Sequence, residues 1–351
     1  MIGSGFTATT TVHVGGEPVE ALELVSSSEI HFKAPPLYAG PAKVTVETSD
    51  GVAADFDGDG DLDLFLGVGT GGPGVVLQNS GAAVFTEAGV DALSADADVL
   101  SGVAMGDLDG DGTPDLVIGN GTPDTTPLRI YFNTSAGGAI RFEAAQEGTA
   151  PAADWIVSTI ALADVDGDHD LDIVVATPVA GDGIALHLLL HDGDAFHDVP
   201  GGLPGGAMGA ITVIAAGDVN GDGAVDLVLT GGGQDRLLIN DGSGHFFDAT
   251  GSGMPLDASS GTSLALVDLD RDRDLDLVIG NSEAETRLYL NDGSGRFLDH
   301  TPILPIRVDA TVWVGAANVD GDGDRDILLL DAAPGPARLY LSVEPKANGA
   351  N

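Results

Sequence analysis

Residues 55–63 read Asp-Phe-Asp-Gly-Asp-Gly-Asp-Leu-Asp, and five later stretches repeat this pattern of alternating acids and small residues. Successive copies start 52, 57, 54, 50 and 50 residues apart. A pattern that returns about every 50 residues is typical of a radial or stacked repeat architecture, in which each repeat is one supersecondary unit. The six copies start at Asp55, Asp107, Asp164, Asp218, Asp268 and Asn318.

We number each loop from its first residue, so that Asp55 is position 1 of the first loop and Asp63 is position 9. Positions 1, 3, 5 and 9 are Asp or Asn in all six copies. Carboxylates held this close repel one another unless a cation lies among them. Hard oxygen ligands in a flexible loop suit Ca²⁺, which accepts about six to eight oxygens. We expect side-chain ligands from positions 1, 3, 5 and 9, a backbone carbonyl from position 7, and water for the rest.

The sequence therefore predicts up to six Ca²⁺ sites with five protein ligands each. Loop by loop, the predicted metal ligands are Asp55, Asp57, Asp59, Asp61 and Asp63; Asp107, Asp109, Asp111, Thr113 and Asp115; Asp164, Asp166, Asp168, Asp170 and Asp172; Asp218, Asn220, Asp222, Ala224 and Asp226; Asp268, Asp270, Asp272, Asp274 and Asp276; and Asn318, Asp320, Asp322, Asp324 and Asp326.

Glycine at positions 4 and 6 lets most of these loops curl tightly enough for alternating carboxylates to converge. The third loop instead has His169 at position 6, and the fifth has Arg271 and Arg273 at positions 4 and 6. A residue other than glycine is strained at positive φ, so we expect these two loops to be looser. The arginines also bring positive charge close to the metal, which predicts that the loop at Asp268 is the weakest site.

Position 12 separates these loops from the helix-loop-helix calcium site, which needs an acid there as a bidentate ligand. The residue at position 12 is Leu, Ile or Val in every copy, and positions 10–12 form short apolar runs. Such runs, rich in β-branched residues, predict buried strands. The metal loop is therefore expected to join two strands of a hairpin.

Besides the strand after the loop, three strands are predicted in each of the first five repeats. One, rich in small residues, precedes the loop, and a third strand and an outer strand follow the hairpin. The sixth repeat stops after its third strand. Arginine recurs at one place in the third strand, where we expect ion pairs, with a ligand-binding ring as the alternative. These arginines are Arg236, Arg287 and Arg338, and the phenylalanines assigned to the outer strands are Phe85, Phe142, Phe196, Phe247 and Phe297.

These in-register acidic loops resemble the FG-GAP/VCBS repeat family, whose blades also build the head of integrin α subunits. The resemblance covers about residues 51–342. It implies an all-β fold, a β-propeller with Ca²⁺ in the loop between the first two strands of each blade. We expect six visible four-stranded blades, with seven in the full protein as the alternative, and a disordered tail over residues 343–351.

Residues 1–50 lack the acidic loop and alternate short strand patterns with Gly-Gly and Pro-Pro breakers. The order of these motifs resembles a partial IPT/TIG domain, which implies a small immunoglobulin-like β-sandwich fragment. The motifs are Gly5-Phe6, Val12–Gly16, Ile30–Phe32, Pro35-Pro36 and Val44–Val46. Alternatively, residues 29–50 pair with the last blade and close the ring. Phe32 lies 23 residues before Asp55, close to the spacing of the outer-strand phenylalanines.

Composition limits the partners. The formal net charge is −42, and 26 of the 55 acidic residues are aspartates of the six loops, so six Ca²⁺ ions would leave about −30. Nucleic acid and anionic lipid carry phosphates that such a surface repels. No apolar stretch approaches the roughly 18 to 20 residues of a membrane-spanning helix, so membrane insertion is not expected. The chain has no cysteine.

The Ca²⁺ sites favour an extracellular or cell-surface location, because millimolar Ca²⁺ fills weak sites there. Residues 1–6 do not resemble a signal peptide, which predicts that the chain is a fragment of a longer exported protein. The eight histidines match no nucleophile or zinc-helix spacing, and His187 and His191 share one face of a predicted strand.

The sequence therefore predicts a non-enzymatic Ca²⁺-binding adhesion or protein/glycan-binding module. Two alternatives stay open, an accessory or catalytic domain of a carbohydrate-active enzyme and a structural spacer in a large surface protein. The ligand itself is not predicted, because a fold does not determine function.

Overall fold

The computed structural model describes most of the repeat region and short strands before it. The described residues are 13–14, 17–18, 20–26, 29–33, 44–45, 51–67, 74–81, 84–89, 93, 100–122, 126–146, 148–151, 155–179, 183–193, 195–204, 209–305, 308, 310–317, 325–332 and 338–340. The predicted tail over residues 343–351 lies outside them.

The chain divides into two compact units. The first contains residues 1–164, 168–178 and 186–200, and the second contains residues 165–167, 179–185 and 201–351. The sheets of the first two repeats lie in the first unit and those of the last three in the second. Most of the third sheet lies in the first unit, and the end of β15 and the start of β16 belong to the second.

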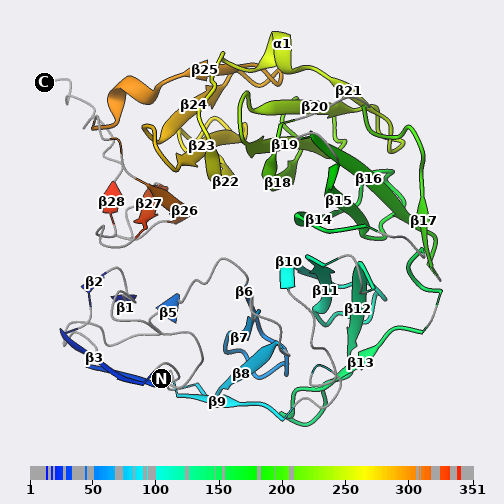
Figure 1. Cartoon of the computed structure of the whole chain (residues 1–351), viewed down its shortest axis with the longest axis vertical. Coiled ribbons are helices and arrows are strands. Elements are labelled where there is room, and N and C mark those ends of the chain that lie inside the picture. Colours follow the sequence, from blue (N-terminus) through cyan, green and yellow to red (C-terminus); the bar gives the residue numbers. More distant parts are fainter. Residues whose placement is uncertain are drawn as a thin grey trace, which may run out of the picture. The chain divides into compact units, whose positions relative to one another are not determined.

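Each repeat folds into one antiparallel sheet whose strands pair in chain order (Figure 1). The first three sheets are four-stranded. They consist of β6 (Gly51–Ala54), β7 (Asp63–Leu66), β8 (Val75–Asn79) and β9 (Phe85–Glu87); of β10 (Leu100–Gly106), β11 (Asp115–Asn120), β12 (Leu128–Asn133) and β13 (Phe142–Ala144); and of β14 (Thr159–Ala163), β15 (Asp172–Val179), β16 (Gly183–His191) and β17 (Phe196–Asp198).

The next two sheets repeat this plan, and the sixth has three strands in the part of the chain that is described. They consist of β18 (Ile211–Gly217), β19 (Asp226–Gly231), β20 (Arg236–Asn240) and β21 (Phe246–Asp248); of β22 (Gly261–Val267), β23 (Asp276–Asn281), β24 (Arg287–Asn291) and β25 (Phe297–Asp299); and of β26 (Thr311–Ala317), β27 (Asp326–Asp331) and β28 (Arg338–Tyr340).

The predicted hairpin is confirmed, because each acidic loop joins the first and second strands of its sheet. Position 9 begins the second strand and pairs with the last residue of the first, as Asp63 does with Ala54 and Asp276 with Val267. Positions 10–12 form the buried strands that their apolar runs predict: Leu116 and Val117 of β11 are both fully buried. Adjacent residues of a strand point to opposite faces, so these middle strands are covered on both sides.

The core lies between neighbouring sheets rather than inside one sheet. In the first unit, Phe65 of β7 and Leu116 of β11 belong to one buried cluster that joins the first two sheets. In the second unit, Val228 of β19 and Leu277 of β23 belong to a cluster that joins the fourth and fifth. Apolar burial of this kind stabilises by about 25 cal/mol per Å², so each sheet depends on its neighbour.

The outer-strand phenylalanines are confirmed, including Phe247, which lies in β21. Phe246, not Phe247, is the buried residue of β21: Phe246 is 6% exposed and Phe247 is 61% exposed. Phe246 pairs with Asn240 in the same register in which Phe297 pairs with Asn291. Two adjacent phenylalanines point to opposite faces of a strand, and only the register shows which one faces the core.

The recurring arginines form ion pairs, as predicted. Arg236 pairs with Asp248, Arg338 pairs with Asp331, and Nε of Arg287 lies 2.7 Å from Oδ2 of Asp257. Tyr289 also donates to Oδ2 of Asp257, at 3.1 Å. These contacts lie within the repeats of the second unit.

Two small sheets precede the repeats. β1 (His13–Val14) pairs with β2 (Glu17–Pro18) and β5 (Val44–Thr45), and β3 (Glu20–Ser26) pairs with β4 (Glu29–Lys33). The segment considered for ring closure thus contributes β4 to a hairpin with β3. Among the strands described, it does not pair with β28.

The two helical segments that are described are single turns, α1 (Thr250–Gly253) and η2 (Thr301–Ile303). Within the described residues, no helix has the length and apolar character needed to cross a bilayer.

A buried acid between β19 and β20 has an unusual environment. Asp235 is 3% exposed and accepts a hydrogen bond from Thr230 at 2.5 Å. Burial raises the pKa of Asp235 to about 6, and the charge of Asp257 adds to this, while Thr230 and Arg287 oppose it. The folded state therefore binds the Asp235 proton more tightly than the unfolded chain does.

This predicts how Asp235→Asn changes the pH dependence of stability. A folded-state pKa raised above the unfolded value near 4 contributes stability that is full below pH 4 and is lost as the pH rises through 6. Between pH 4 and pH 7.5 the wild type should therefore lose about 2 to 3 kcal/mol relative to Asp235→Asn. Urea denaturation in saturating Ca²⁺ measures the difference.

Glu283→Gln removes the same charge from an exposed side chain and is the matched control. Its stability relative to wild type should stay constant over the same pH range. A pH-independent difference for Asp235→Asn would contradict the prediction.

Candidate metal centre

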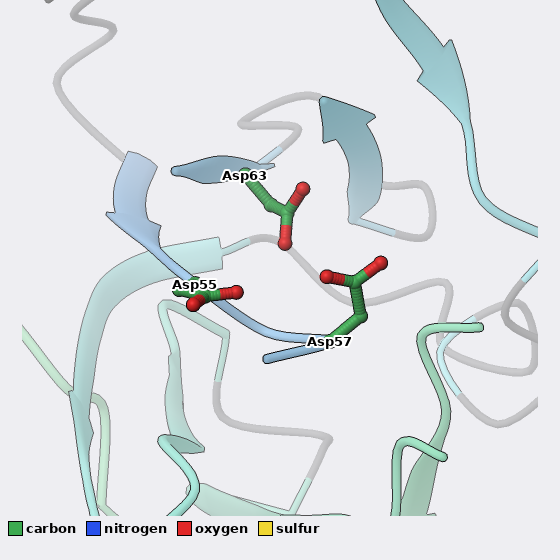
Figure 2. A group of neighbouring side chains, drawn as sticks. All are labelled: Asp55, Asp57 and Asp63. Atoms are coloured by element: carbon green, nitrogen blue, oxygen red, sulfur yellow. The ribbon is translucent and has the colours of Figure 1, made fainter. Parts of the chain in front are cut away.

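Among the residues that the structure describes, four loops bring three carboxylates together. In each, one oxygen from positions 1, 3 and 9 lies within 4.8 Å of the others. Figure 2 shows the first of these groups, with the carboxylates of Asp55, Asp57 and Asp63 turned toward one another. The groups are Asp55, Asp57 and Asp63; Asp107, Asp109 and Asp115; Asp164, Asp166 and Asp172; and Asp268, Asp270 and Asp276.

In the first five loops, which are described, backbone N–H groups donate to the position 1 carboxylate. In the first loop, Gly58 N–H donates to Oδ1 of Asp55 at 2.9 Å, and Gly60 N–H donates to Oδ2 at 2.9 Å. In the fourth loop, Asp218 accepts the same two bonds. The side chains at positions 3 and 5 each accept a bond from the N–H two residues later, as Asp57 and Asp59 do. These bonds fix the loop backbone in the conformation in which alternate side chains, the acids, point inward.

The position 9 aspartate is fully buried in all six repeats. Oδ2 of Asp63 accepts the Phe56 N–H at 2.9 Å, and Oδ1 accepts the Asn79 N–H at 2.7 Å. Burial raises the pKa of this carboxyl to about 6 against the opposing effect of the two N–H donors, and the charges of neighbouring loop acids raise it further. The pKa is raised in this way at Asp63, Asp115, Asp226 and Asp276.

The donor set fits a hard divalent cation. Three carboxylates converge, and one of them is removed from water. Oδ1 of Asp107 is buried and has no hydrogen-bond partner. A buried, unpaired carboxylate oxygen is costly, and a cation at the centre of the group would remove that cost.

The predicted ligand roles of position 5 and of the position 7 carbonyl stay predictions. Oδ1 of Asp59 at position 5 accepts the Asp61 N–H at 2.9 Å, just as Oδ1 of Asp57 at position 3 accepts the Asp59 N–H, and this bond leaves the second oxygen of either carboxylate available. The carboxylates of Asp61 and Asp274 lie against Gly81 and Gly293, where a Cβ would meet them at 2.6 and 2.5 Å. The position 7 side chain thus points toward the turn after the third strand, which leaves its carbonyl as the group that can face the loop.

The fourth loop has Asn220 at position 3 and Ala224 at position 7, so it offers acids only at positions 1, 5 and 9, which are Asp218, Asp222 and Asp226. Asn220 donates to Asp222 at 2.9 Å. Positions 1–7 of the sixth loop, residues 318–324, lie outside the described residues. Its ninth, Asp326, is buried at the start of β27.

The strain expected at the substituted glycine positions is confirmed. His169, Arg271 and Arg273 have φ values of 80°, 69° and 81°, and they are the non-glycine residues with positive φ in the described part of the chain. The equivalent glycines Gly58 and Gly60 have φ values of 76° and 94°. These loops therefore share one backbone conformation, whether glycine, histidine or arginine occupies the position. The loop at Asp268 still brings its three acids together, and its expected rank as the weakest site stays a prediction.

An asparagine at the end of the third strand also holds the site, and the sequence analysis did not identify its role. Nδ2 of Asn291 donates to the Val219 carbonyl of the preceding loop at 2.7 Å and to the Leu275 carbonyl of its own loop at 3.2 Å. Asn133 and Asn240 make the equivalent bonds. Aligning the repeats would have shown this recurring asparagine, but not what it contacts.

The strain predicts that Arg271→Gly stabilises the metal-free protein. Positive φ costs a non-glycine residue about 1–2 kcal/mol, and the flexibility of glycine in the unfolded chain offsets about half of this. We expect Arg271→Gly to be about 0.5 to 1 kcal/mol more stable than Arg271→Ala in urea denaturation with EGTA. The alanine variant loses the same charge but keeps Cβ, so equal stabilities would mean that the backbone is not strained.

Comparisons with known proteins identify the repeats. The model of the FG-GAP-like repeat matches residues 55–118, 218–279 and 268–329, together half of the chain. The FG-GAP repeat model matches residues 100–139. The IPT/TIG domain model matches residues 1–59, so that match extends past residue 50 into the first acidic loop.

A curated relative and two solved structures are similar to this chain. Cartilage acidic protein 1 of Xenopus tropicalis is 31% identical over 176 residues, which cover 46% of this chain and 25% of that protein. The match thus spans about a quarter of the relative's length. A lectin of Agrocybe aegerita that recognises non-reducing terminal N-acetylglucosamine is 19% identical, with a TM-score of 0.52 over 83% of this chain and 80% of the lectin.

The second structure is BBS1N in complex with ARL6DN, 12% identical, with a TM-score of 0.53 over 84% of this chain and 79% of that one. Both similarities show a shared fold and nothing further. Because models of the repeat match half of the chain, and each repeat forms one antiparallel sheet, the chain belongs to the FG-GAP repeat family as an all-β, six-bladed propeller with an N-terminal IPT/TIG domain.

Proposed function

We propose that this protein is a Ca²⁺-stabilised, non-enzymatic β-propeller that acts outside the cell as an adhesion or protein/glycan-binding module. The observation that carries the proposal is the repeated convergence of the carboxylates at positions 1, 3 and 9 in four loops. Oxygen-only ligand sets favour Ca²⁺ over transition metals.

The cation has a structural role in this proposal. Each loop joins the first two strands of a blade, and its position 9 aspartate also binds the N–H at the end of the third strand. Neutralising the loop therefore stabilises three strands at once. Cytosolic Ca²⁺ is too dilute to fill weak sites of this kind, which supports an extracellular location.

Binding is favoured over catalysis by the arrangement of the reactive side chains. Within the described residues, the groups of three or more His, Asp or Glu side chains close enough to share a metal all lie in the repeat loops. The arginines of the third strands are engaged in ion pairs with aspartates. The lectin with the same fold recognises a terminal sugar, which supports glycans as one ligand class to test.

Removing the metal should lower the melting temperature. A ligand at 100 times its Kd stabilises by about 2.7 kcal/mol per site, so four filled sites predict a fall on the order of 10 °C or more when EGTA replaces 2 mM Ca²⁺. Differential scanning calorimetry measures the shift, and Mg²⁺ in place of Ca²⁺ is the control for ionic strength. Identical melting in EGTA and in Ca²⁺ would refute the metal role.

Ligand binding can be tested on a glycan array with the full chain in 2 mM Ca²⁺. The expected result is binding to a restricted set of glycans that is lost in EGTA, because the loops hold the blades in place. A parallel assay for depolymerised polysaccharide tests catalysis. Product formation would favour the carbohydrate-active enzyme, and no ligand on the array or in protein pull-downs would favour a structural spacer.

A further inference from the structure

A pocket of about 480 Å³ lies at one end of the fourth sheet, within the second unit. Its lining includes Gly232 directly after β19, Arg236 at the start of β20, Asp248 at the end of β21, and Thr250 and Gly251 of α1. The acidic loop of this repeat joins β18 and β19 at the opposite end of the sheet, so the pocket is separate from the candidate metal centre. Its volume falls in the range of about 300–1,000 Å³ that is typical of small-molecule sites.

Asp248 supplies a charged acceptor to this pocket. Its Oδ1 accepts the Thr250 N–H at 3.0 Å, and its Oδ2 accepts an N–H of Arg236. Burial alone would raise the pKa of Asp248, but the bonds from Thr250 and Arg236 hold it below its ordinary value. The side chain is 38% exposed, so the remaining lone pairs of the carboxylate can accept hydrogen bonds from a ligand.

The guanidinium of Arg236 keeps donors that the described residues do not use. Among these residues its hydrogen-bond acceptor is Asp248, and its buried Nε has no partner. Arg287, at the equivalent position of β24, differs, because Asp257 accepts from its Nε at 2.7 Å and Ser259 accepts from its Nη2 at 3.4 Å. The Arg236 side chain is 26% exposed, so its planar fork can donate to a ligand beside Asp248.

Three glycines leave the backbone of the pocket wall uncovered. They are Gly209, Gly232 and Gly251. A Cβ at Gly209 would meet the Gly232 carbonyl oxygen at 2.1 Å, so these two backbone segments require glycine for their close approach. A Cβ at Gly251 would meet no atom within 4 Å, so the space beside it is open. Glycine in such a wall lets a ligand approach the backbone closely.

Hydrogen bonds hold this pocket in shape. Gln234 also lines it; its Nε2 donates to the Pro255 carbonyl at 2.9 Å, and its Oε1 accepts the Asp257 N–H at 3.0 Å. The Leu237 N–H donates to Oγ1 of Thr250 at 3.1 Å, which ties α1 to β20. The polar groups are therefore fixed before a ligand arrives, and binding orders few additional side chains.

The lining disfavours charged and apolar ligands. Arg236 and Asp248 together are neutral, so an anion would compete with Asp248 for the guanidinium and would be repelled by a chain of net charge −42. The described residues of the lining carry no large apolar side chain, so an apolar ligand would bury little apolar area. A donor and an acceptor fixed side by side match two neighbouring hydroxyl groups, because each hydroxyl both donates and accepts.

We propose that this pocket binds a neutral saccharide unit, with Arg236 donating to and Asp248 accepting from neighbouring hydroxyl groups and the glycine backbone contacting the sugar ring. The inference deepens the proposed function and rests on it in taking glycans as the ligand class. Removing Ca²⁺ would weaken this binding through the stability of the blade, because no metal ligand lines the pocket.

The test is saturation-transfer difference NMR on the full chain in 2 mM Ca²⁺. The probes are N-acetylglucosamine and the methyl glycosides of glucose, galactose and mannose, with N-acetylneuraminic acid as the anionic probe. We expect saturable binding of at least one neutral probe and none of the acid. Gly251→Leu places a side chain in the open space without strain, since Gly251 does not have positive φ, and should weaken binding at least tenfold.

Gly89→Leu is the matched control, because a Cβ at Gly89, which follows β9 in the first repeat, also meets no atom within 4 Å. It should leave saccharide affinity unchanged.

Arg236→Gln removes the donor and should also weaken binding at least tenfold, whereas Arg338→Gln breaks the ion pair with Asp331 in the sixth repeat and should not. Melting temperatures in Ca²⁺ confirm that each variant is folded. Wild-type affinity in both Gly251→Leu and Arg236→Gln would overturn the proposal, as would preference for the anionic probe or the absence of saturable binding.

A glycan array probed with wild type and with Gly251→Leu separates this inference from the proposed function. Glycan binding that Gly251→Leu retains in full would refute this pocket alone, because the ligand would then bind elsewhere on the chain. A wild-type protein that binds neither the array nor any of the neutral probes would refute both the pocket and the glycan-binding function.

Discussion

A fully buried carboxylate at the ninth position of each acidic loop is the constraint on which the repeat depends. Its two oxygens accept one N–H from the loop and one from the end of the third strand, so it ties three strands together. Burial raises the pKa of the carboxyl, as at Asp63 and Asp115, which means that its charged form is unfavourable without compensation. A cation among the neighbouring acids would supply that compensation, so the structural element and the candidate metal site coincide.

The same element connects neighbouring blades. The asparagine whose N–H binds the buried carboxylate also donates its side-chain amide to the preceding loop, as Asn291 does to the Val219 carbonyl. Apolar clusters between adjacent sheets supply most of the burial. Hydrogen bonds fix the register of one blade on the next, and buried apolar area supplies the free energy of packing between blades. A change in one loop therefore affects the blade beside it.

Variation among the loops is confined to positions that leave this framework intact. His169 and Arg271 keep the backbone path of a glycine despite the strain, and His191 keeps the backbone bond of the asparagine it replaces. The framework therefore tolerates substitutions that alter the charge around each loop.

The sequence by itself determined the repeat period, the hairpin position of the loops, the buried strands and the absence of a helix-loop-helix calcium site, because these follow from residue type at fixed local spacing. It also identified the carboxylates at positions 1, 3 and 9. Only the tertiary structure decided that Phe246 rather than Phe247 enters the core and that Asn291 binds a loop 72 residues away. Those outcomes depend on strand register and on distances between segments remote in sequence, which local patterns do not encode.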